Sequence, residues 1–271
     1  MKQKIKITTV FALFVLAVAV LMSVVPGLFT SYDPLKTDAI NRLLPPSSEH
    51  ICGTDELGSD IRSRVVYGTR NSLSVGFGAA ALALLLGVPL GLLAGWKGGL
   101  ADSLIMRVMD AFQSFPSVLL AVLFIVIFDP SVLTLILTIG LVSFPYFARI
   151  VRSNVLYIKT TEYVEATRAF GAGTGYLLFR TILPNCISSI TVQFSLLAAT
   201  AILIEAGLSF LGMGIQSPEP AWGSMLSYAK DYVDRSVSYV VAPTTAIFLV
   251  VLSINMLGDS IRDWVDPKNK K

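Results

Sequence analysis

Six long uncharged stretches alternate with shorter charged ones along this 271-residue chain. Each stretch holds 18 or more residues, near the roughly 20 that an α-helix needs to cross a bilayer core. The third and fourth stretches are the shortest and should extend by about a turn, and the fifth should continue past Glu205 to about Ile215. The pattern predicts an all-α polytopic membrane protein with six transmembrane helices, at Ile7–Phe29, Leu73–Trp96, Ala111–Phe128, Ser131–Ala148, Cys186–Ile204 and Ser236–Gly258.

The distribution of lysine and arginine predicts the orientation of these helices. If the N-terminus is cytoplasmic, 14 of the 21 basic residues fall in cytoplasmic segments and 7 fall outside, spread over longer loops. Because cytoplasmic loops carry the excess of Lys and Arg, both termini are expected to lie in the cytoplasm. Residues 1–29 then form an uncleaved N-terminal anchor, since 23 apolar or weakly polar residues exceed the usual signal-peptide core of about 7–15.

The same orientation divides the rest of the chain. Residues 30–72 are predicted to form an extracytoplasmic loop that ends in an amphipathic helix, capped by Thr54 or Asp55. Residues 73–258 form a five-helix core with a cytoplasmic loop at 160–184, and residues 259–271 form a cytoplasmic tail. The acids of the outer loop lack the spacing of an EF-hand, so we do not expect calcium there.

Composition excludes several classes of protein. The chain is 54% hydrophobic and 14% charged, with a mean hydropathy of +0.70, which is unlike a soluble domain. Its net charge of +3 follows from the basic cytoplasmic segments and does not indicate nucleic-acid binding. One histidine, His50, and two cysteines on opposite membrane sides, Cys52 and Cys186, are too few and too scattered for a metal site or a catalytic triad. We therefore expect no metal ligands and no catalytic residues.

The stretch Glu162–Pro184 is the most distinctive cytoplasmic segment. Thr161 stands where it can cap a short helix, Glu162 lies in the first turn of that helix, and Arg168 lies near its end. Gly171 follows at the position where a left-handed residue stops a helix. Tyr176–Leu183 is predicted to form a second, apolar helix that ends at Pro184. Membrane proteins seldom keep such an ordered segment between spans unless another protein docks on it.

This stretch resembles the EAA loop of the permease subunits of ABC importers. The matching residues are Glu165, Ala166, Thr167, Gly171, Leu183 and Pro184, with Thr167 in place of the family's usual alanine. Two further blocks resemble the peptide and nickel permeases of that family, at residues 53–73 and 205–226. The chain end fits as well, at Asn255, Leu257, Gly258, Asp259, Arg262, Asp263, Asp266 and Pro267. The resemblance covers nearly the whole chain and is closest to the C-type permease of dipeptide, oligopeptide and nickel importers.

The resemblance implies a type I ABC importer permease fold in the cytoplasmic membrane of a bacterium or archaeon. It implies a homologous second permease, an extracytoplasmic binding protein, and two ATPase subunits that grip the EAA loop. ATP and magnesium would bind those ATPase subunits, because this chain has no phosphate-binding G-x-x-x-x-G-K-[ST] motif and should bind no cofactor itself. The substrate would be a small peptide, nickel or a nickel chelate. The short chain tilts the expectation slightly toward nickel, although the scarcity of His and Cys argues against a bare-metal pathway.

Several residues are candidates for the pathway, a gate or helix packing. Glu205 is a single carboxylate in an apolar segment, so it should face protein, water or a partner, either as a packing residue or as a gate. The other pathway or gate candidates are Ser209, Phe210, Trp222 and Asn255. Gly87, Gly91 and Gly95 recur every four residues around Pro89 and predict a bent helix that another helix approaches closely, within the chain or in a partner.

Two other classes of protein compete with the importer subunit. A secondary transporter needs ionisable residues inside the spans, and Glu205 alone is a thin supply. A membrane enzyme or assembly factor needs catalytic acids or metal ligands near the interface, and the sequence offers none. Neither class explains the ordered cytoplasmic loop, so the importer permease is the preferred interpretation.

The orientation can be tested by labelling single cysteines in intact cells. We predict that Cys52 faces outward and that Glu165 and both termini face the cytoplasm, because the basic residues favour that side by 14 to 7. An impermeant maleimide should therefore leave a cysteine placed at Glu165 unlabelled until the cells are opened. Ready labelling at Glu165 in intact cells, with Cys52 protected, would contradict this orientation.

Overall fold

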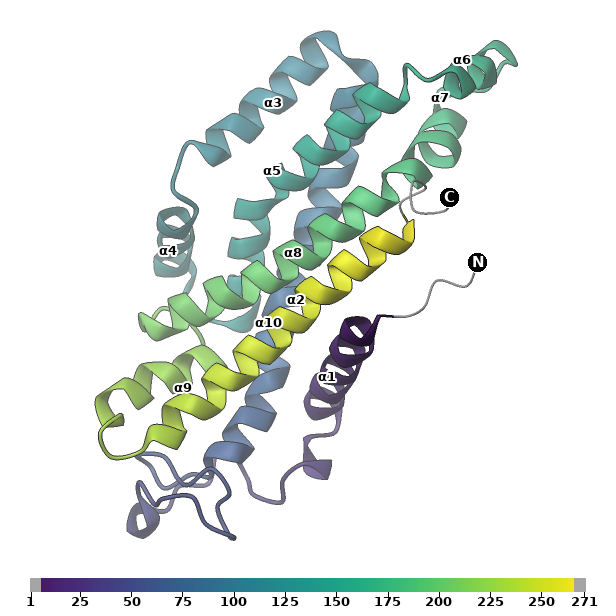
Figure 1. The fold of residues 1–271 in the computed structure, drawn as a ribbon. Coiled ribbons are helices and arrows are strands. Elements are labelled where there is room, and N and C mark those ends of the chain that lie inside the picture. The colour runs from purple at the N-terminus through teal and green to yellow at the C-terminus, as the bar shows by residue number, and fades with distance from the viewer. Residues whose placement is uncertain (1–5, 266–271) are drawn as a thin grey trace.

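The computed structural model describes residues 6–265, and their fold is nearly all helical. The terminal lysines counted above (Lys2, Lys4, Lys268, Lys270 and Lys271) and the end of the predicted tail, with Asp266 and Pro267, lie outside the described residues. Long helices form the body, and short helices cap its two ends (Figure 1). The α-helices are α1 Ile7–Val24, α2 Ile61–Lys97, α3 Gly99–Gln113, α4 Ser117–Phe128, α5 Val132–Ile158, α6 Glu162–Ala169, α7 Thr174–Tyr176, α8 Leu183–Phe210, α9 Trp222–Ala229 and α10 Val237–Val265.

Five of the described helices are long and apolar enough to cross a membrane, and a bent pair supplies a sixth crossing if it counts as one span. The pair is α3 and α4, which meet at 81°. The prediction of a single span at Ala111–Phe128 is therefore wrong in its shape. Pro116 lacks a backbone N–H and disfavours a helical conformation at Phe115, so the helix stops at Gln113 and restarts at Ser117.

The second span begins well before its apolar stretch. α2 is 37 residues long and starts at Ile61, so the expected boundary between residues 72 and 73 falls inside one continuous helix. The predicted caps are also wrong, because Asp60 is the N-cap and its Oδ1 accepts from the Ser63 amide at 2.7 Å. Thr54 and Asp55 instead order the preceding loop, where the Asp55 carboxylate lies 3.3 Å from Arg64. Burial raises the pKa of Asp55, and Arg64 opposes that rise.

The centre of the body is the contact between α2 and α5. Gly87, Gly91 and Gly95 all lie against α5, so their close approach is internal to the chain. A Cβ on Gly87 would lie 2.5 Å from the Phe144 carbonyl oxygen, and one on Gly91 would lie 2.5 Å from that of Ala148. Small residues let helix backbones meet in this way in a membrane, where apolar burial alone does not drive helices together.

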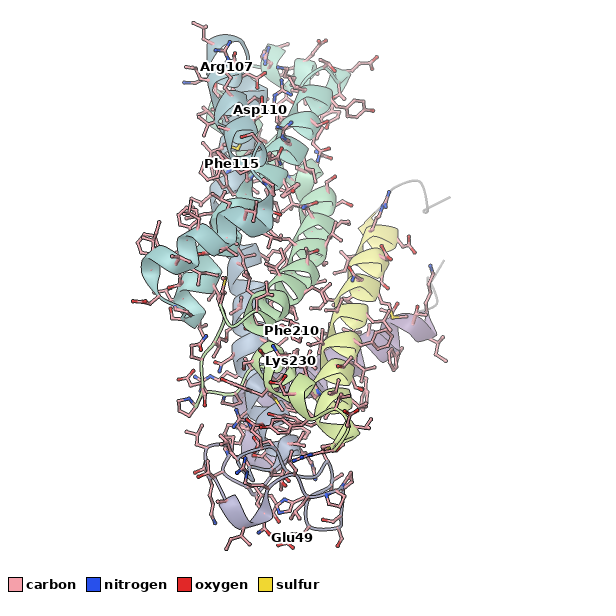
Figure 2. All side chains as sticks on the ribbon, turned by 90° about the vertical axis from the view of Figure 1, so that its left-hand side faces the viewer. Glu49, Arg107, Asp110, Phe115, Phe210 and Lys230 are labelled. Atoms are coloured by element: carbon pink, nitrogen blue, oxygen red, sulfur yellow. The ribbon has the colours of Figure 1, made fainter. Side chains whose placement is uncertain are left out.

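The two ends of the body carry different segments. α6 lies at one end, and the start of α1 and the end of α10 point toward that end, whereas α9 and residues 30–60 lie at the other (Figure 1). The Lys6 Nζ lies 2.7 Å from the Asp263 Oδ2, so this ion pair joins the start of α1 to the end of α10. Figure 2 places Glu49 at the tip of the outer loop, far from Arg107 on α3. This arrangement agrees with an orientation in which both termini and the loop at 160–184 face the cytoplasm.

Gly91→Val tests the packing of α2 on α5. Because the added Cβ meets main-chain atoms of Ala148 rather than a flexible side-chain tip, we expect a loss of stability of roughly 1–3 kcal/mol. Thermal unfolding of the purified protein in detergent, at one scan rate, would show a lower midpoint. Leu93→Val on the same helix is the control, because Leu93 is 40% exposed. Equal midpoints for the two variants would contradict a tight contact at Gly91.

Candidate functional site: the EAA loop and Glu205

Residues 160–184, called the EAA loop here, open with α6. Thr161 occupies the N-cap position, but its hydroxyl donates back to the Ile158 carbonyl at 2.6 Å instead of accepting from the helix. The predicted side-chain cap is therefore wrong. Glu162 and Glu165 lie in the first turn and Arg168 in the last, so their charges complement the helix dipole without that cap.

The end of α6 matches the prediction for Gly171, which has φ +84°. Its amide donates to the Arg168 carbonyl at 2.9 Å, and the Ala172 amide donates to that of Thr167 at 3.3 Å. These two bonds form a Schellman closure, which requires a left-handed residue at this position. A Cβ on Gly171 would meet nothing within 4 Å, so only the backbone conformation demands glycine.

One face of α6 is fixed to the transmembrane helices. Val164 is fully buried in the main hydrophobic cluster. The Arg168 guanidinium lies 5.1 Å from the centre of the Trp96 ring at the end of α2, and the Lys159 Nζ donates to the Gly95 carbonyl at 2.8 Å. Arg168 and Glu165 are three residues apart on α6 but form no ion pair among the described residues; Arg168 stacks on Trp96 instead.

The opposite face of α6 is open. It presents two carboxylates, two small residues and one aromatic ring, from Glu162, Glu165, Ala166, Ala169 and Phe170. Phe170 is 92% exposed, although it belongs to a rigid turn rather than to a lipid-facing span. A large aromatic ring on an exposed rigid turn is typical of a residue that packs into a partner's pocket.

The segment after Gly171 differs from the prediction. A helix starts at Thr174 and passes through Pro184 without stopping, so the expected end at Pro184 is wrong. Residues Leu177–Ile182 form a π-helical turn, in which the Leu183 amide donates to the Leu178 carbonyl. The wider turn accommodates the proline, which has no amide to donate. Leu183 is half-buried against the main cluster and Pro184 is exposed.

Glu205 lies at the other end of α8 and is completely buried. One carboxylate oxygen accepts from the Ser209 hydroxyl at 2.8 Å, one turn further along α8. The other accepts from the Ser72 hydroxyl of α2 at 3.2 Å. The position satisfies the expectation that this carboxylate faces protein rather than lipid, and the hydrogen bonds join α2 to α8.

Trp222 extends this network to α9. Its amide donates to the Ser72 hydroxyl at 3.4 Å, and its indole Nε1 donates to the Val65 carbonyl at 3.0 Å. Gly223 lets α9 approach α8 closely, because a Cβ there would lie 2.6 Å from the Cα of Ala206. Three elements thus meet around one carboxylate, and we call Ser72, Glu205, Ser209 and Trp222 the Glu205 network.

The structure does not bring the other two pathway candidates into this network. Phe210 lies at the end of α8, 41% exposed, with the Lys230 ammonium 5.1 Å from its ring centre (Figure 2). The Asn255 amide donates to Val251 within α10 at 3.0 Å. Among the described residues no group of three or more His, Cys, Asp or Glu side chains could hold a metal ion.

Three residues of these sites were missed by sequence reasoning. Trp96 closes the second apolar stretch, and the hydropathy pattern identifies it only as the boundary of that stretch. Phe170 precedes Gly171 inside the EAA motif. A large aromatic residue in a loop predicted to be cytoplasmic is a sequence signal for a partner contact that could have identified it. Ser72 belongs to the block at residues 53–73 that resembles the peptide and nickel permeases, but its role could not be predicted, because nothing local to one hydroxyl shows that a carboxylate 133 residues away will accept its hydrogen bond.

Comparisons with known proteins agree with this architecture. The family model described as binding-protein-dependent transport system inner membrane component matches residues 87–271. The dipeptide transport system permease protein DppC of Alkalihalophilus pseudofirmus is 42% identical over 96% of this chain and 86% of its own length. The oligopeptide transport system permease protein OppC of Bacillus subtilis is 38% identical over 96% of this chain and 85% of its own length.

A solved structure shows the same fold. An inward-facing form of the MetNI methionine ABC transporter superposes with a TM-score of 0.62 at 21% identity, covering 75% of this chain and 96% of the transporter chain. About three quarters of this chain thus shares the fold of that transporter chain. The chain therefore belongs to the family of binding-protein-dependent transport system inner membrane components, and it is a transmembrane permease subunit of an ATP-binding cassette importer.

Proposed function

We propose that this subunit forms half of a pathway for small peptides in the cytoplasmic membrane. Its relatives at 38–42% identity over most of both chains are named for dipeptide and oligopeptide transport. A glutathione transport system permease protein, GsiD of Pectobacterium atrosepticum, is 44% identical over 83% of this chain and 75% of its own length, and glutathione is also a short peptide. These names favour a peptide over the nickel or nickel chelate to which the short chain had tilted the expectation.

The EAA loop is the observation that carries the proposal. Val164, Trp96 and the Schellman closure hold α6 rigidly on the ends of the transmembrane helices. Its free face offers small residues that let a partner approach closely and the exposed ring of Phe170. A rigid, exposed helix at the cytoplasmic end suits a docking site for an ATPase subunit, whose movements it would pass to the spans.

Three further partners complete the proposed transporter. A homologous permease would supply the other half of the pathway, and a second ATPase subunit would engage the EAA loop of that permease. An extracytoplasmic binding protein would deliver the peptide to the end that carries α9. ATP and magnesium would act on the ATPase subunits, and this chain would bind no cofactor. Family membership favours this assembly over a secondary transporter.

Within the assembly, we propose that the Glu205 network fixes the outer ends of α2, α8 and α9 relative to one another. The alternative role, a charged gate, needs a carboxylate that contacts the pathway. Because Glu205 is fully buried with both oxygens hydrogen-bonded, the geometry favours the structural role.

Substitution of Gly171 tests the EAA loop. A β-branched residue at φ +84° costs roughly 1–2 kcal/mol, which corresponds to about a five- to thirtyfold loss of docking affinity if the turn reorients to relieve the strain. We expect Gly171→Val to insert normally but to copurify less ATPase and to abolish peptide uptake. Gly171→Asn should be milder, because asparagine tolerates the left-handed region. Glu165→Ala should have a weak effect of the same kind.

Gly173→Val is the matched control for this experiment. Gly173 lies two residues away, has φ −69°, and also has open space around it. Valine there adds the same bulk to the same loop without the strained backbone. If Gly171→Val protein binds its ATPase subunits and transports as the control does, the docking role of the EAA loop is wrong.

Two substitutions at Glu205 distinguish a requirement for its charge from a requirement for its hydrogen bonds. Glu205→Gln keeps the size of the side chain and can serve both Ser72 and Ser209, so uptake and thermal stability should stay near wild type. Glu205→Ala leaves both hydroxyls without their acceptor and opens a cavity, so stability should fall by about 1–3 kcal/mol and uptake should be lost. If Gln abolishes uptake in a normally assembled transporter, the charge itself is required and the structural role is wrong.

A further inference from the structure

Two adjoining cavities lie between α1 and the rest of the body, at the end opposite the EAA loop. The first has a volume of about 360 Å³ and a mainly apolar lining. It sits between the end of α1, the outer part of α2 and the start of α10, and its apolar wall includes Met22, Phe29, Val65, Val66, Val241 and Ala242. Cys52 also lines this cavity and is half-buried.

The second cavity, of about 260 Å³, is mainly polar. It shares Phe29, Ile51 and Arg62 with the first, so the two cavities adjoin. Its remaining wall comes from the segment that follows α1, including Thr30 and Tyr32, and from the outer loop. An apolar cavity beside a polar one suits a ligand that is itself apolar at one end and polar at the other.

Arg62 stands at the junction of the two cavities with its charge unpaired. Among residues 6–265 its side chain has no hydrogen-bond or ion-pair partner. Two carboxylates line the polar cavity with Arg62. Asp60 is engaged, because it accepts from the Ser63 amide and bonds with His50 at 2.9 Å, whereas Glu49 has no hydrogen-bond or ion-pair partner among the described residues and leaves room for the cationic part of a zwitterionic headgroup. A half-buried guanidinium without a protein partner calls for an anion, and it binds the oxygens of a phosphate well.

The two cavities coincide with the boundary of the membrane. α1 has 18 residues and is therefore about 27 Å long, close to the thickness of a hydrocarbon core. Met22 lies in its last turn, and the segment from Gly27 to Tyr32 that lines the polar cavity follows immediately. On α10, which begins at Val237, the lining residue Val241 is one turn inside the span. The apolar cavity thus lies at acyl-chain depth and the polar one at headgroup depth.

We propose that this pair of cavities binds one phospholipid of the outer leaflet. An acyl chain would fill the apolar cavity beside Cys52, and the phosphodiester would bind the Arg62 guanidinium. The rest of α1 is consistent with lipid around it, because Ala12 and Ala19 are its only fully buried residues among those described. The bound lipid would fill the gap between α1 and the core and so hold the anchor helix in place. This inference depends on membrane insertion and not on the transported substrate.

Cys52 is a natural reporter of occupancy, because it lines the apolar cavity. Burial raises the pKa of its thiol, Asp60 raises it further, and Arg62 lowers it, so labelling is best done at mildly alkaline pH. The purified transporter, stripped of lipid in a maltoside detergent, is treated with N-ethylmaleimide, and mass spectrometry separates Cys52 from Cys186. Phosphatidylglycerol, phosphatidylethanolamine, diacylglycerol or inorganic phosphate is then added at equal concentration.

We expect each phospholipid to slow the labelling of Cys52 at least fivefold, and diacylglycerol or phosphate to slow it less than twofold. Arg62→Gln should reduce the protection by phospholipid at least threefold, whereas Arg235→Gln, at an exposed outer arginine away from the cavities, should not. Protection is taken as the ratio of rates with and without lipid for each variant, which cancels the effect of Arg62 on the pKa of Cys52.

A second pair of variants tests the apolar cavity. Val241→Trp should fill it and remove both the protection and the copurifying phospholipid seen by native mass spectrometry. Phe248→Trp is the control on the same helix, at a residue that is 60% exposed and outside the cavity. Equal protection by diacylglycerol, protection by phosphate alone, or unchanged protection in Arg62→Gln would overturn the proposal. The proposal would also be overturned if the Cys52 thiol stayed protected in the lipid-free transporter and reacted only after another subunit was removed. A subunit rather than a lipid would then cover the cavity.

Discussion

The close contact between α2 and α5 is the constraint on which the rest of the structure depends. Lipid tails are as apolar as leucine, so helices in a membrane gain little from apolar burial and must be held by packing and hydrogen bonds. Gly87, Gly91 and Gly95 remove the side chains from one face of α2, and the main chain of α5 fills that space. With these two helices fixed, the other spans and both terminal segments have a rigid element to pack against.

α2 also connects the two candidate sites. At 37 residues it is about 55 Å long, so it extends well beyond the hydrocarbon core. The end of α2 nearest Lys97 carries Gly95 and Trp96, which contact Lys159 just before the EAA loop and Arg168 within it. Its outer part carries Ser72, which bonds to Glu205. If a partner displaced α6 as proposed, the displacement would therefore act on a helix that reaches the outer network, without an intervening flexible loop.

The sequence predicted the parts of this architecture that depend on local chemistry. Apolar stretches located the spans, and Gly171 was placed in a left-handed turn because the residues around it contain their own stop signal. The failures came where two competing signals share a segment. Asp60 outcompeted Thr54 and Asp55 as the cap of α2, since those two residues are engaged inside the loop. The Glu205 network could not be predicted beyond its carboxylate, because its donors come from distant parts of the chain.

Pro184 shows why a helix can continue through a residue that usually ends it, and how that continuation lengthens α8. A proline inside an α-helix loses one hydrogen bond and clashes with the preceding turn, which is why an end was expected there. The π-helical turn Leu177–Ile182 removes the conflict by widening the backbone just before the proline, so the helix continues from Thr174 to Phe210. As a result α8, like α2, runs from the EAA loop to the Glu205 network. The two helices are joined by the Ser72–Glu205 hydrogen bond and also pack at Gly76, where an added Cβ would meet Ile202. Because the Trp222 amide of α9 donates to the same Ser72 hydroxyl, a change in the relative tilt of α2 and α8 would reach α9 through this outer contact.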